Sequence, residues 1–316
     1  MTRKVGVVVS SDALIDRMGP LPDEVTLLPL TPGDEPDTAQ RSAPLLVLAP
    51  DLTYLLPRLA DLEGLTTIQT LNAGVEWLLP HIPAGVAAHS ASGAHDIPVA
   101  EWVLAAVLSL YHQFPRYHDA QRREAWDPTG NALTTPPKDI PGDDLHAKKV
   151  TIVGYGSIGR ATERRMAAFG ADVRGVSRRG GPGVATPDGL GALLADTDVL
   201  VLLCPLTEAT RGMIDADVLA ALPDAALVVN AARGPVLDQA ALEAEVRAGR
   251  LRAALDVTDP EPLPDGHSLW SAPGLLITPH SAGSSRHWMD RAYAFAGDQV
   301  RRFAAGQPLL NLRTDG

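Results

Sequence analysis

The chain contains a single cysteine, Cys204, and this residue lies inside the apolar run VLVLLCPL. One cysteine excludes a disulfide framework and a cysteine-rich zinc site, and it is typical of a reducing compartment. No apolar run approaches the roughly 18 residues of a membrane span, and the one near the N-terminus is too short for a signal peptide. These absences predict a cytoplasmic protein with no membrane partner.

Positive charge is also scarce. The formal net charge is −11, and lysine occurs only at positions 4, 138, 148 and 149. A negative field of this size argues against nucleic acid or an anionic membrane surface as the main partner. A small anionic substrate fits nevertheless, because one arginine at contact distance outweighs the global field.

Apolar residues make up 45% of the 316 residues, which is enough for two domains. The runs VGVVVS (5–10) and PLLVLAP (44–50) are typical of parallel strands covered on both faces, and LTTIQTLNAG (65–74) predicts another strand. The helix-like segment LTYLLPRLADL (52–62) lies between two of them. These features predict a first α/β unit.

A long apolar helix is predicted over 98–114, opened by Pro98, and it is apolar enough all round to lie in a core or an oligomer interface. Residues 126–144 are predicted to form a loop. A second series of strands begins at Lys149, with helical patterns between most of them, and an amphipathic helix over 287–306 ends the chain. The predicted fold is α/β, with two Rossmann-like, doubly wound parallel-sheet domains. The strands of the second series are KVTIVGYG, ADVRGVS, TDVLVLLCP, AALVVNAA, RAALDV and LLITPH.

A GxGxxG fingerprint stands between the first strand of the second series and the helix that follows it. Gly154 permits a tight turn, Gly156 lets the backbone approach a pyrophosphate, and Gly159 lets helix and strand pack closely. The alternative is an ordinary glycine-rich turn, but the strand–turn–helix context favours dinucleotide binding. The predicted cofactor-binding residues here are Gly154, Tyr155, Gly156, Ser157, Ile158 and Gly159.

The end of the next strand favours NADP over NAD. An NAD site usually has a carboxylate there, whereas this chain has Ser177, Arg178 and Arg179. A hydroxyl and two guanidinium groups suit a 2′-phosphate, which a carboxylate would repel. The alternative is that both arginines simply face solvent.

Polar residues follow three later strands, at the edge where α/β sheets bind ligands. Arg233 could grip a carboxylate, and Glu261 beside His280 would orient the imidazole and favour its protonated form. His280 could then exchange a proton with a carbonyl oxygen. Taken singly, each has a structural explanation: a surface ion pair, a proline-rich turn or a cap. Together beside a dinucleotide fingerprint they favour catalysis.

The chain resembles the D-isomer-specific 2-hydroxyacid dehydrogenase family in several motifs from about Leu71 onward. These motifs are LNAGVEWL, HDIPVAEWVLAAVLSL, KKVTIVGYGSIGRA, PLTEATRGMI, VVNAARGPVLD, AALDVTDPEPLP and ITPHSAG. The resemblance implies a substrate domain of residues 1–97 and 287–316, with a coenzyme domain of residues 98–286 inserted in it. It also implies a homodimer formed through the region of the helix after Pro98. No metal site is predicted.

The same resemblance assigns roles to individual residues. It implies that Arg233 binds substrate, that Glu261 and His280 form the acid–base pair, and that Asp256 holds the nicotinamide carboxamide. Further cofactor contacts are implied for Pro205, Thr210 and Ala231. The substrate carboxylate is expected on the backbone of Asn72, Ala73, Gly74 and Val75, and the orientation of the nearby Trp77 is left open.

The predicted function is NADPH-dependent reduction of a small 2-oxo acid, with glyoxylate and hydroxypyruvate as the preferred candidates. One alternative is an NAD-dependent enzyme acting on phosphoglycerate or phosphite. Another is a non-catalytic protein that senses dinucleotides, which the joint presence of Arg233, Glu261 and His280 disfavours. Formate is a poor candidate, because the formate-oxidising branch has glutamine where Glu261 stands here.

Overall fold

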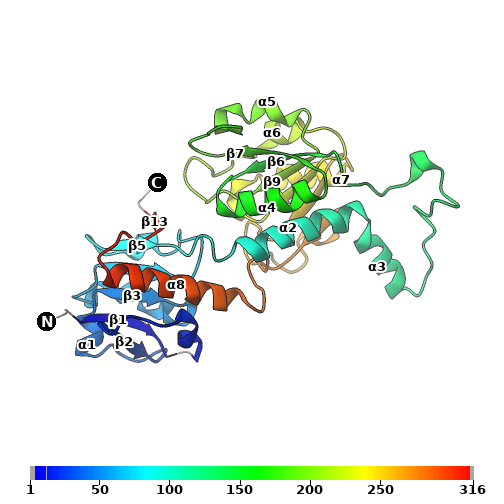
Figure 1. Cartoon of the computed structure of the whole chain (residues 1–316). Coiled ribbons are helices and arrows are strands. Elements are labelled where there is room, and N and C mark those ends of the chain that lie inside the picture. The colour runs from blue at the N-terminus through cyan, green and yellow to red at the C-terminus, as the bar shows by residue number, and fades with distance from the viewer. Residues whose placement is uncertain (1–3, 12, 314–316) are drawn as a thin grey trace. The chain divides into compact units, whose positions relative to one another are not determined.

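The computed structural model describes residues 4–11 and 13–313. Contacts divide the chain into two units, each with its own sheet (Figure 1). Unit 1 consists of Met1–His95 and Ser285–Gly316, and unit 2 is the continuous stretch Asp96–Ser284. The boundaries that the family resemblance implies, 97/98 and 286/287, lie two residues later.

The sheet of unit 1 has six strands in the order β13-β5-β4-β3-β1-β2. All neighbours are parallel except the short β13, which runs antiparallel to β5. The strands are β1 (Val5–Ser10), β2 (Val25–Leu30), β3 (Leu45–Leu48), β4 (Thr67–Thr70), β5 (Ala87–His89) and β13 (Leu312–Arg313).

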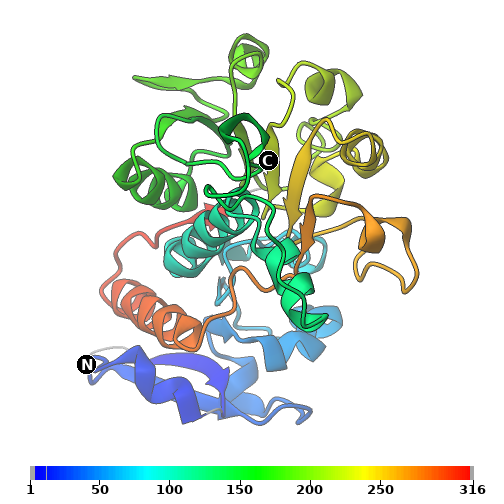
Figure 2. The same cartoon turned by 90° about the vertical axis from the view of Figure 1, so that its right-hand side faces the viewer.

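Both faces of this sheet are covered, which explains why β1 (VGVVVS) and β3 (LLVL) are apolar without alternation. Leu52, Leu55 and Leu59 of the 3-10 helix η2 (Pro50–Asp61) pack on one face. On the other face lie Met18 of η1 (Ala13–Met18) and helix α8 (Trp288–Ala304), which returns to unit 1 (Figures 1 and 2). The short elements of this unit are α1 (Thr38–Arg41) and η3 (Leu79–His81).

The sheet of unit 2 has seven parallel strands in the order β12-β11-β10-β9-β6-β7-β8. Because all of them run the same way, their carboxyl ends lie along one edge. The strands are β6 (Lys149–Val153), β7 (Asp172–Val176), β8 (Val184–Ala185), β9 (Val199–Leu202), β10 (Leu227–Asn230), β11 (Arg252–Leu255) and β12 (Leu275–Ile277).

Helices cover this sheet on both faces, so the α/β fold with two parallel sheets predicted from the sequence is confirmed. Helices α2 (Asp96–Tyr111) and α4 (Ser157–Ala168) share one core with the sheet. The opposite core contains α5 (Gly191–Leu194), α6 (Ala216–Ala220) and α7 (Gln239–Arg247). The 3-10 turns of unit 2 are η4 (Pro137–Asp139), η5 (Pro187–Gly189), η6 (Gly234–Val236) and η7 (Ser268–Ser271).

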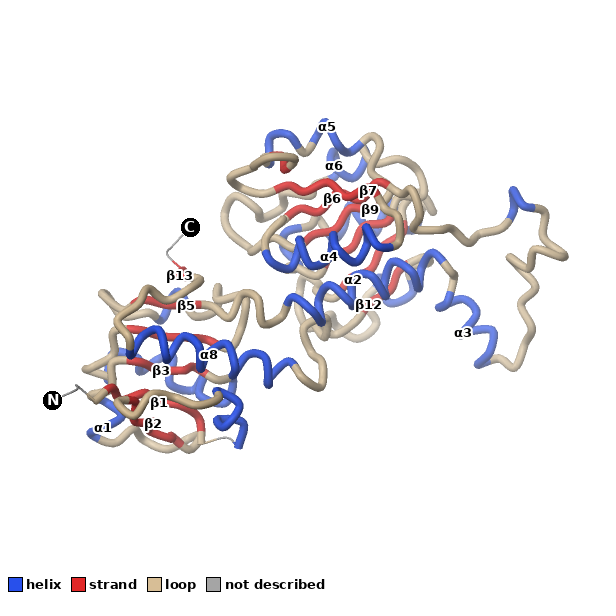
Figure 3. Tube along the Cα trace, viewed as in Figure 1, coloured by secondary structure: helices blue, strands red, loops and turns tan. Residues whose placement is uncertain are grey.

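Residues 112–144 form an arm that extends away from the sheet of unit 2 (Figure 3). It begins with α3 (Phe114–Arg122) and continues mostly as loop. In the described residues no single helix is long and apolar enough to cross a membrane. The bent pair α2–α3, whose axes differ by 68°, meets that length and composition only when taken together.

Three sequence expectations differ from the structure. The predicted helix 98–114 starts earlier, at Asp96, and stops at Tyr111, because Gln113 adopts a left-handed backbone with φ of 57°. The helix-like segment 52–62 is a 3-10 helix that contains Pro57. Strand β2 was missed, and it is an edge strand with Pro29 inside it, a residue that weakens any strand signal.

Candidate active site

The glycine fingerprint forms a tight connection between β6 and α4. Gly154 has φ of 97°, and a side chain there would overlap the Cys204 amide nitrogen. A methyl group on Gly159 would lie 2.8 Å from the Gly154 carbonyl oxygen. Only glycine fits at these two positions, since both contacts are with backbone atoms.

The turn also leaves room for a phosphate. Gly156 is the N-cap of α4, and among the described residues no atom other than those of its chain neighbours lies within 4 Å of where its Cβ would be. No side chain caps this helix end, and its first turn has no acidic residue. Free space at a helix N-terminus fits the pyrophosphate of a dinucleotide.

Tyr155 stabilises the glycine turn by contacts with both β7 and α4. Its ring fills the space above Gly175 of β7, and its hydroxyl donates a hydrogen bond to Glu163 of α4. Burial, together with this carboxylate, raises the pKa of Tyr155 to about 12, so the phenol stays neutral. Tyr155 therefore links the strand and the helix that flank the fingerprint.

The turn after β7 carries Ser177, Arg178 and Arg179, the residues predicted to select the cofactor. The Ser177 amide donates to the Ala185 carbonyl over 3.0 Å, which fixes the turn. Arg178 and Arg179 are exposed, and within residues 4–11 and 13–313 neither makes a recorded ion pair. Both guanidinium groups thus face solvent at the carboxyl edge of the sheet.

Strands β10, β11 and β12 are neighbours, with Asn230 opposite Leu255 and Leu255 opposite Ile277. Arg233, Asp256, Glu261 and His280 follow these strands, so they lie at the same edge as the glycine turn.

His280 and Glu261 are in direct contact. The imidazole Nδ1 lies 2.6 Å from Oε1 of Glu261, and the two side chains are 49% and 38% exposed. A carboxylate only accepts hydrogen bonds, so Nδ1 carries the donated proton. Nε2 is therefore the atom that can exchange a proton with a ligand.

The backbone of His280 is unusual. Its φ is 51°, in the left-handed region that costs a residue with a side chain roughly 1–2 kcal/mol. The His280 amide donates to the carbonyl oxygens of Asp256 (2.8 Å) and Thr278 (3.0 Å). The surrounding chain therefore has to hold this conformation.

Asp256 is 3% exposed, and its carboxylate is occupied by the chain itself. It accepts hydrogen bonds from the Thr278 hydroxyl (2.5 Å) and from the amides of Ser281 (2.8 Å) and Ala282 (2.9 Å). The expected contact with the nicotinamide carboxamide stays a prediction, and it would have to reach a buried group that already has three donors.

Arg233 is presented by a turn that Asn230 holds. Asn230 is fully buried, and its side chain donates to the Arg233 carbonyl (3.1 Å) and accepts from the Ala232 amide (3.0 Å). A side chain on Gly234 would overlap the Thr258 carbonyl oxygen. The Arg233 turn thus packs directly against the segment that leads to Glu261.

That segment is fixed in turn by polar contacts. The Thr258 hydroxyl donates to the Pro260 carbonyl over 2.9 Å. The Gln239 side chain bonds both the amide (2.9 Å) and the carbonyl (2.7 Å) of Asp259. Sequence reasoning missed Asn230, Gln239 and Thr278; the one available signal was a polar residue at the end of an apolar strand, which Asn230 shows.

The other predicted cofactor contacts lie on neighbouring turns. Thr210 donates to the Pro205 carbonyl over 2.7 Å and closes the loop after β9. Ala231 follows β10, and its amide donates to the Leu202 carbonyl over 3.2 Å. Their cofactor roles stay predictions.

The predicted carboxylate-binding loop lies in unit 1, directly after β4. The Asn72 carbonyl accepts from the Ala91 amide (2.8 Å) and the Thr70 hydroxyl (2.9 Å). The Trp77 indole donates to the Gly74 carbonyl over 3.2 Å. In the described residues the amides of Ala73, Gly74 and Val75 have no recorded backbone acceptor, so they suit an anion.

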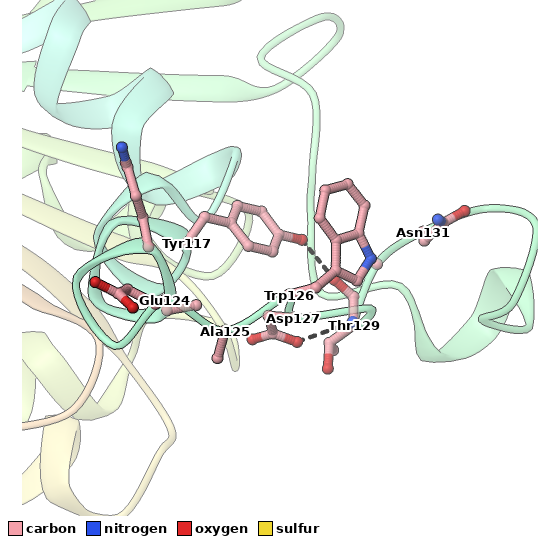
Figure 4. Close-up of a pocket in the computed structure, with 10 residues that line it drawn as sticks. Tyr117, Glu124, Ala125, Trp126, Asp127, Thr129 and Asn131 are labelled. Atoms are coloured by element: carbon pink, nitrogen blue, oxygen red, sulfur yellow. Dashed lines mark hydrogen bonds between the residues drawn. The ribbon is translucent and has the colours of Figure 1, made fainter.

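A hollow of about 790 Å³ is lined by residues of the arm. Figure 4 shows it between Tyr117 and Trp126, with the Tyr117 hydroxyl donating to Thr129. Trp126 is 86% exposed. The chemistry described above is at the sheet edge, so this hollow is not the candidate active site. Within the described residues no group of three potential metal-ligating His, Cys, Asp or Glu residues occurs.

Comparison with known proteins relates the chain to dehydrogenases that bind a nicotinamide cofactor. Residues 104–282 match the model of the NAD-binding domain of D-isomer specific 2-hydroxyacid dehydrogenases. The chain is 32% identical over 216 residues to a glycerate dehydrogenase of Methylorubrum extorquens, covering 66% of each protein. It is 33% identical over 229 residues to D-3-phosphoglycerate dehydrogenase of Mycobacterium bovis, covering 71% of this chain but only 42% of that protein.

A solved structure extends the likeness to both units. The D-isomer specific 2-hydroxyacid dehydrogenase of Xanthobacter autotrophicus Py2, in complex with NADPH and MES, superimposes with a TM-score of 0.77. It is 30% identical, and the match covers 98% of each chain. The protein therefore belongs to the D-isomer specific 2-hydroxyacid dehydrogenase family and is an NAD(P)-dependent oxidoreductase.

Proposed function

We propose that the protein is an NADPH-dependent reductase of a small 2-oxo acid of the glyoxylate or hydroxypyruvate type. The reaction consumes the 2-oxo acid, NADPH and one proton, and it yields the 2-hydroxy acid and NADP⁺. The observation that carries the proposal is the 2.6 Å contact between His280 and Glu261 at the edge that also holds the glycine turn.

When bound, the reduced nicotinamide supplies a hydride to the carbonyl carbon. Side chains of the protein supply the proton and bind the substrate. His280 gives the proton on Nε2 to the carbonyl oxygen, while Glu261 keeps the ring oriented through Nδ1. Arg233 binds the substrate carboxylate.

The choice of NADPH rests on the turn after β7. Two exposed guanidinium groups and a hydroxyl stand where an NAD-binding protein would have a carboxylate. The related Xanthobacter structure contains NADPH, which favours the same assignment.

Replacing Arg178 and Arg179 together with Ala tests this assignment. The affinity for NADPH should fall by about 10-fold or more, because hydrogen bonds to charged groups contribute roughly 1.5–3 kcal/mol each. The affinity for NADH should stay within about 2-fold. Arg122→Ala, which removes an exposed guanidinium from α3, is the matched control. Equal losses for the two cofactors would contradict NADP selectivity.

We assign contacts with the substrate's substituent to the carboxyl edge of the unit 1 sheet, beside loop 72–75. Ser10, Leu48 and Thr70 end neighbouring strands there, and the Ser10 hydroxyl donates to Asp51 over 2.6 Å. In unit 1 Arg17 pairs with Asp290, and Arg58 pairs with Glu35 and Asp61. Arg291 donates to the Ala94 carbonyl (3.2 Å) and the Ser285 hydroxyl (2.9 Å).

With the amides of Ala73, Gly74 and Val75 assigned to the substrate carboxylate, this edge has no further donor that we assign to a phosphate. It suits a hydrogen or a hydroxymethyl group, as in glyoxylate or hydroxypyruvate. Phosphoglycerate remains the alternative on the name of the mycobacterial relative, of which the chain covers less than half.

A panel of 2-oxo acids assayed with NADPH and with NADH tests the proposal through the absorbance of the reduced cofactor. Glyoxylate or hydroxypyruvate with NADPH should give the highest kcat/KM. A higher value for phosphohydroxypyruvate or for NADH would favour the phosphoglycerate alternative. A cofactor that raises Tm without any turnover would indicate a dinucleotide sensor.

We further propose that the arm carries a homodimer contact. Trp126 and Leu133 on the arm are 86% and 93% exposed, and Phe114 at its base is 59% exposed. Large apolar side chains this exposed mark an association surface. Sedimentation velocity should show a dimer for the wild type and a monomer for Trp126→Glu with Leu133→Glu, and a monomeric wild type would overturn the assignment.

A further inference from the structure

The inference concerns the peptide groups of the predicted carboxylate-binding loop in unit 1. The Asn72 carbonyl accepts hydrogen bonds from the Thr70 hydroxyl (2.9 Å) and the Ala91 amide (2.8 Å). The Gly74 carbonyl accepts one from the indole Nε1 of Trp77 (3.2 Å). Two carbonyls of the loop are therefore held by other parts of unit 1, and in both cases a side chain takes part.

Peptide geometry converts these contacts into directions for the amides. A trans peptide is planar, so its C=O and its N–H point in opposite directions. The peptides from Asn72 to Ala73 and from Gly74 to Val75 are trans, since the two cis peptide bonds of the described residues follow β11. Holding the Asn72 carbonyl thus aims the Ala73 N–H to the opposite side. Holding the Gly74 carbonyl does the same for the Val75 N–H.

The donors that hold these carbonyls are themselves built into unit 1. Thr70 and Ala91 are fully buried, so the carbonyl that they hold points into the core and the Ala73 amide points out of it. Trp77 is half-buried and packs against the apolar core around η2. In the described part of the chain the amides of Ala73 and Val75 have no recorded acceptor, so both are open to an anion.

We propose that Thr70 and Trp77 are positioning residues for the substrate carboxylate. Each orients an amide toward the carboxylate by holding the carbonyl of the same peptide. Thr70 orients the Ala73 amide in this way, and Trp77 orients the amide of Val75. The kinetic consequences rest on the proposed reductase function, whereas the orientation of the two amides does not.

The two positioning residues differ in how much depends on them. Among the described residues Trp77 is the one recorded donor to the Gly74 carbonyl. Thr70 shares its carbonyl with the Ala91 amide, which would remain if the hydroxyl were lost. Removing the indole donor should therefore weaken carboxylate binding more than removing the hydroxyl.

Trp77→Phe is the main variant, because it keeps an aromatic ring and removes the N–H donor. We expect the KM for the 2-oxo acid to rise about 10-fold with kcat within about 3-fold, because the carboxylate is bound equally in the ground state and the transition state. Trp270→Phe is the matched control, since it removes an indole that donates to the Pro264 carbonyl over 2.9 Å in unit 2. The control should keep the wild-type KM. A loss confined to kcat in Trp77→Phe would overturn the proposal.

Thr70 provides a second pair of variants in case Trp77→Phe is unstable. Thr70→Val removes the hydroxyl at constant shape, and Thr70→Ser keeps it. The valine variant should raise KM by about 3-fold, because one of two hydrogen bonds to the carbonyl is lost. The serine variant should be close to wild type, and equal KM values for the two would count against the proposal.

Oxalate is a carboxylate probe that needs no turnover. In the NMR spectrum of the NADPH-loaded wild type, oxalate should shift the amide resonances of Ala73 and Val75. Trp77→Phe should lose most of the shift at Val75 and keep the shift at Ala73, and Thr70→Val should do the reverse to a smaller extent. Equal losses at both amides would indicate a general loosening of the loop and would overturn the assignment, as would a wild type in which neither amide responds.

These outcomes separate the inference from the proposed function. Residue-specific oxalate shifts without reduction of any 2-oxo acid would refute the reductase function and leave the inference standing. Turnover of a 2-oxo acid with wild-type KM and wild-type oxalate shifts in Trp77→Phe would refute the inference and leave the reductase function standing.

Discussion

At the residue scale, the candidate acid is one atom, Nε2 of His280. Glu261 occupies Nδ1, so the ring has a single nitrogen left for a ligand. The two side chains come from turns nineteen positions apart, and each turn is held by buried polar groups. The orientation of the ring is thus set by the protein before substrate arrives.

Replacing His280 with Ala should lower kcat by roughly 10²- to 10⁴-fold, the usual contribution of a general acid. The Kd of NADPH, measured by fluorescence titration, should change little, because the glycine turn is elsewhere along the edge. His118→Ala, an exposed histidine of α3, should retain wild-type kcat. Unchanged turnover in the His280 variant would remove this residue from the mechanism.

Cys204 should not react with thiol reagents in the folded protein. It is 7% exposed, and burial raises its pKa to about 11, well above the roughly 8.5 of an unfolded thiol. The raised value means that the neutral thiol persists at pH 8. A thiol reagent such as DTNB should therefore report no reaction at pH 8 in buffer and one thiol per chain in guanidinium. Rapid labelling of the native protein would show that this strand end opens.

At the element scale, the strand–turn–helix connection from β6 to α4 contains glycines of two kinds. Gly154 and Gly159 are required by the protein's own backbone, while Gly156 borders open space. The first kind serves folding, and the second leaves room for a ligand.

Gly156→Ala should consequently separate stability from binding. The free protein should keep its Tm, because among the described residues only chain neighbours lie within 4 Å of the added methyl group. The Kd of NADPH should rise by about 10-fold or more if a phosphate contact is lost. Gly191→Ala at the start of α5, where the space is equally open, should change neither quantity. A drop in Tm without a change in Kd would refute the phosphate site.

The elements that sequence reasoning predicted well are the central strands of unit 2. Strands such as β9 and β10 are buried along their whole length, so they appear as short continuous apolar runs. The two-residue β8 and the half-exposed β2 carry no such signal. The break at Gln113 depends on one backbone dihedral, which composition does not reveal.

The residues that could do chemistry at the candidate site were predictable from the sequence, but the buried residues that hold them were not. Strand ends in a parallel sheet share an edge, so the meeting of Glu261 with His280 followed from topology. The hydrogen bonds that Asn230 and Asp256 accept depend on which amides of a turn point inward. That information arises only when the turn is built, and no spacing in the sequence encodes it.

At the scale of the whole molecule, each unit has its own pair of cores. Unit 2 contains both of its clusters within one continuous stretch, while unit 1 needs residues from both ends of the chain. The two units therefore differ in what they require in order to fold.

A fragment of residues 96–284 should fold alone and bind NADPH with a Kd within about 3-fold of the whole protein. It should not reduce any 2-oxo acid, since it lacks loop 72–75 and the rest of unit 1. Circular dichroism and fluorescence titration test the two expectations, with Gly156→Ala in the fragment as the negative control for binding. An unfolded fragment would show that unit 2 depends on unit 1.

Helix α8 affects the order in which the two units can fold during synthesis. Its side chains Tyr293, Ala296 and Val300 fill the core beneath β1 and β3, yet they are translated after the whole of unit 2. Domains usually mature on the ribosome in order from the N-terminus. Here the inserted coenzyme unit can finish first, and the N-terminal part of unit 1 must wait, half-assembled, until helix α8 leaves the ribosome.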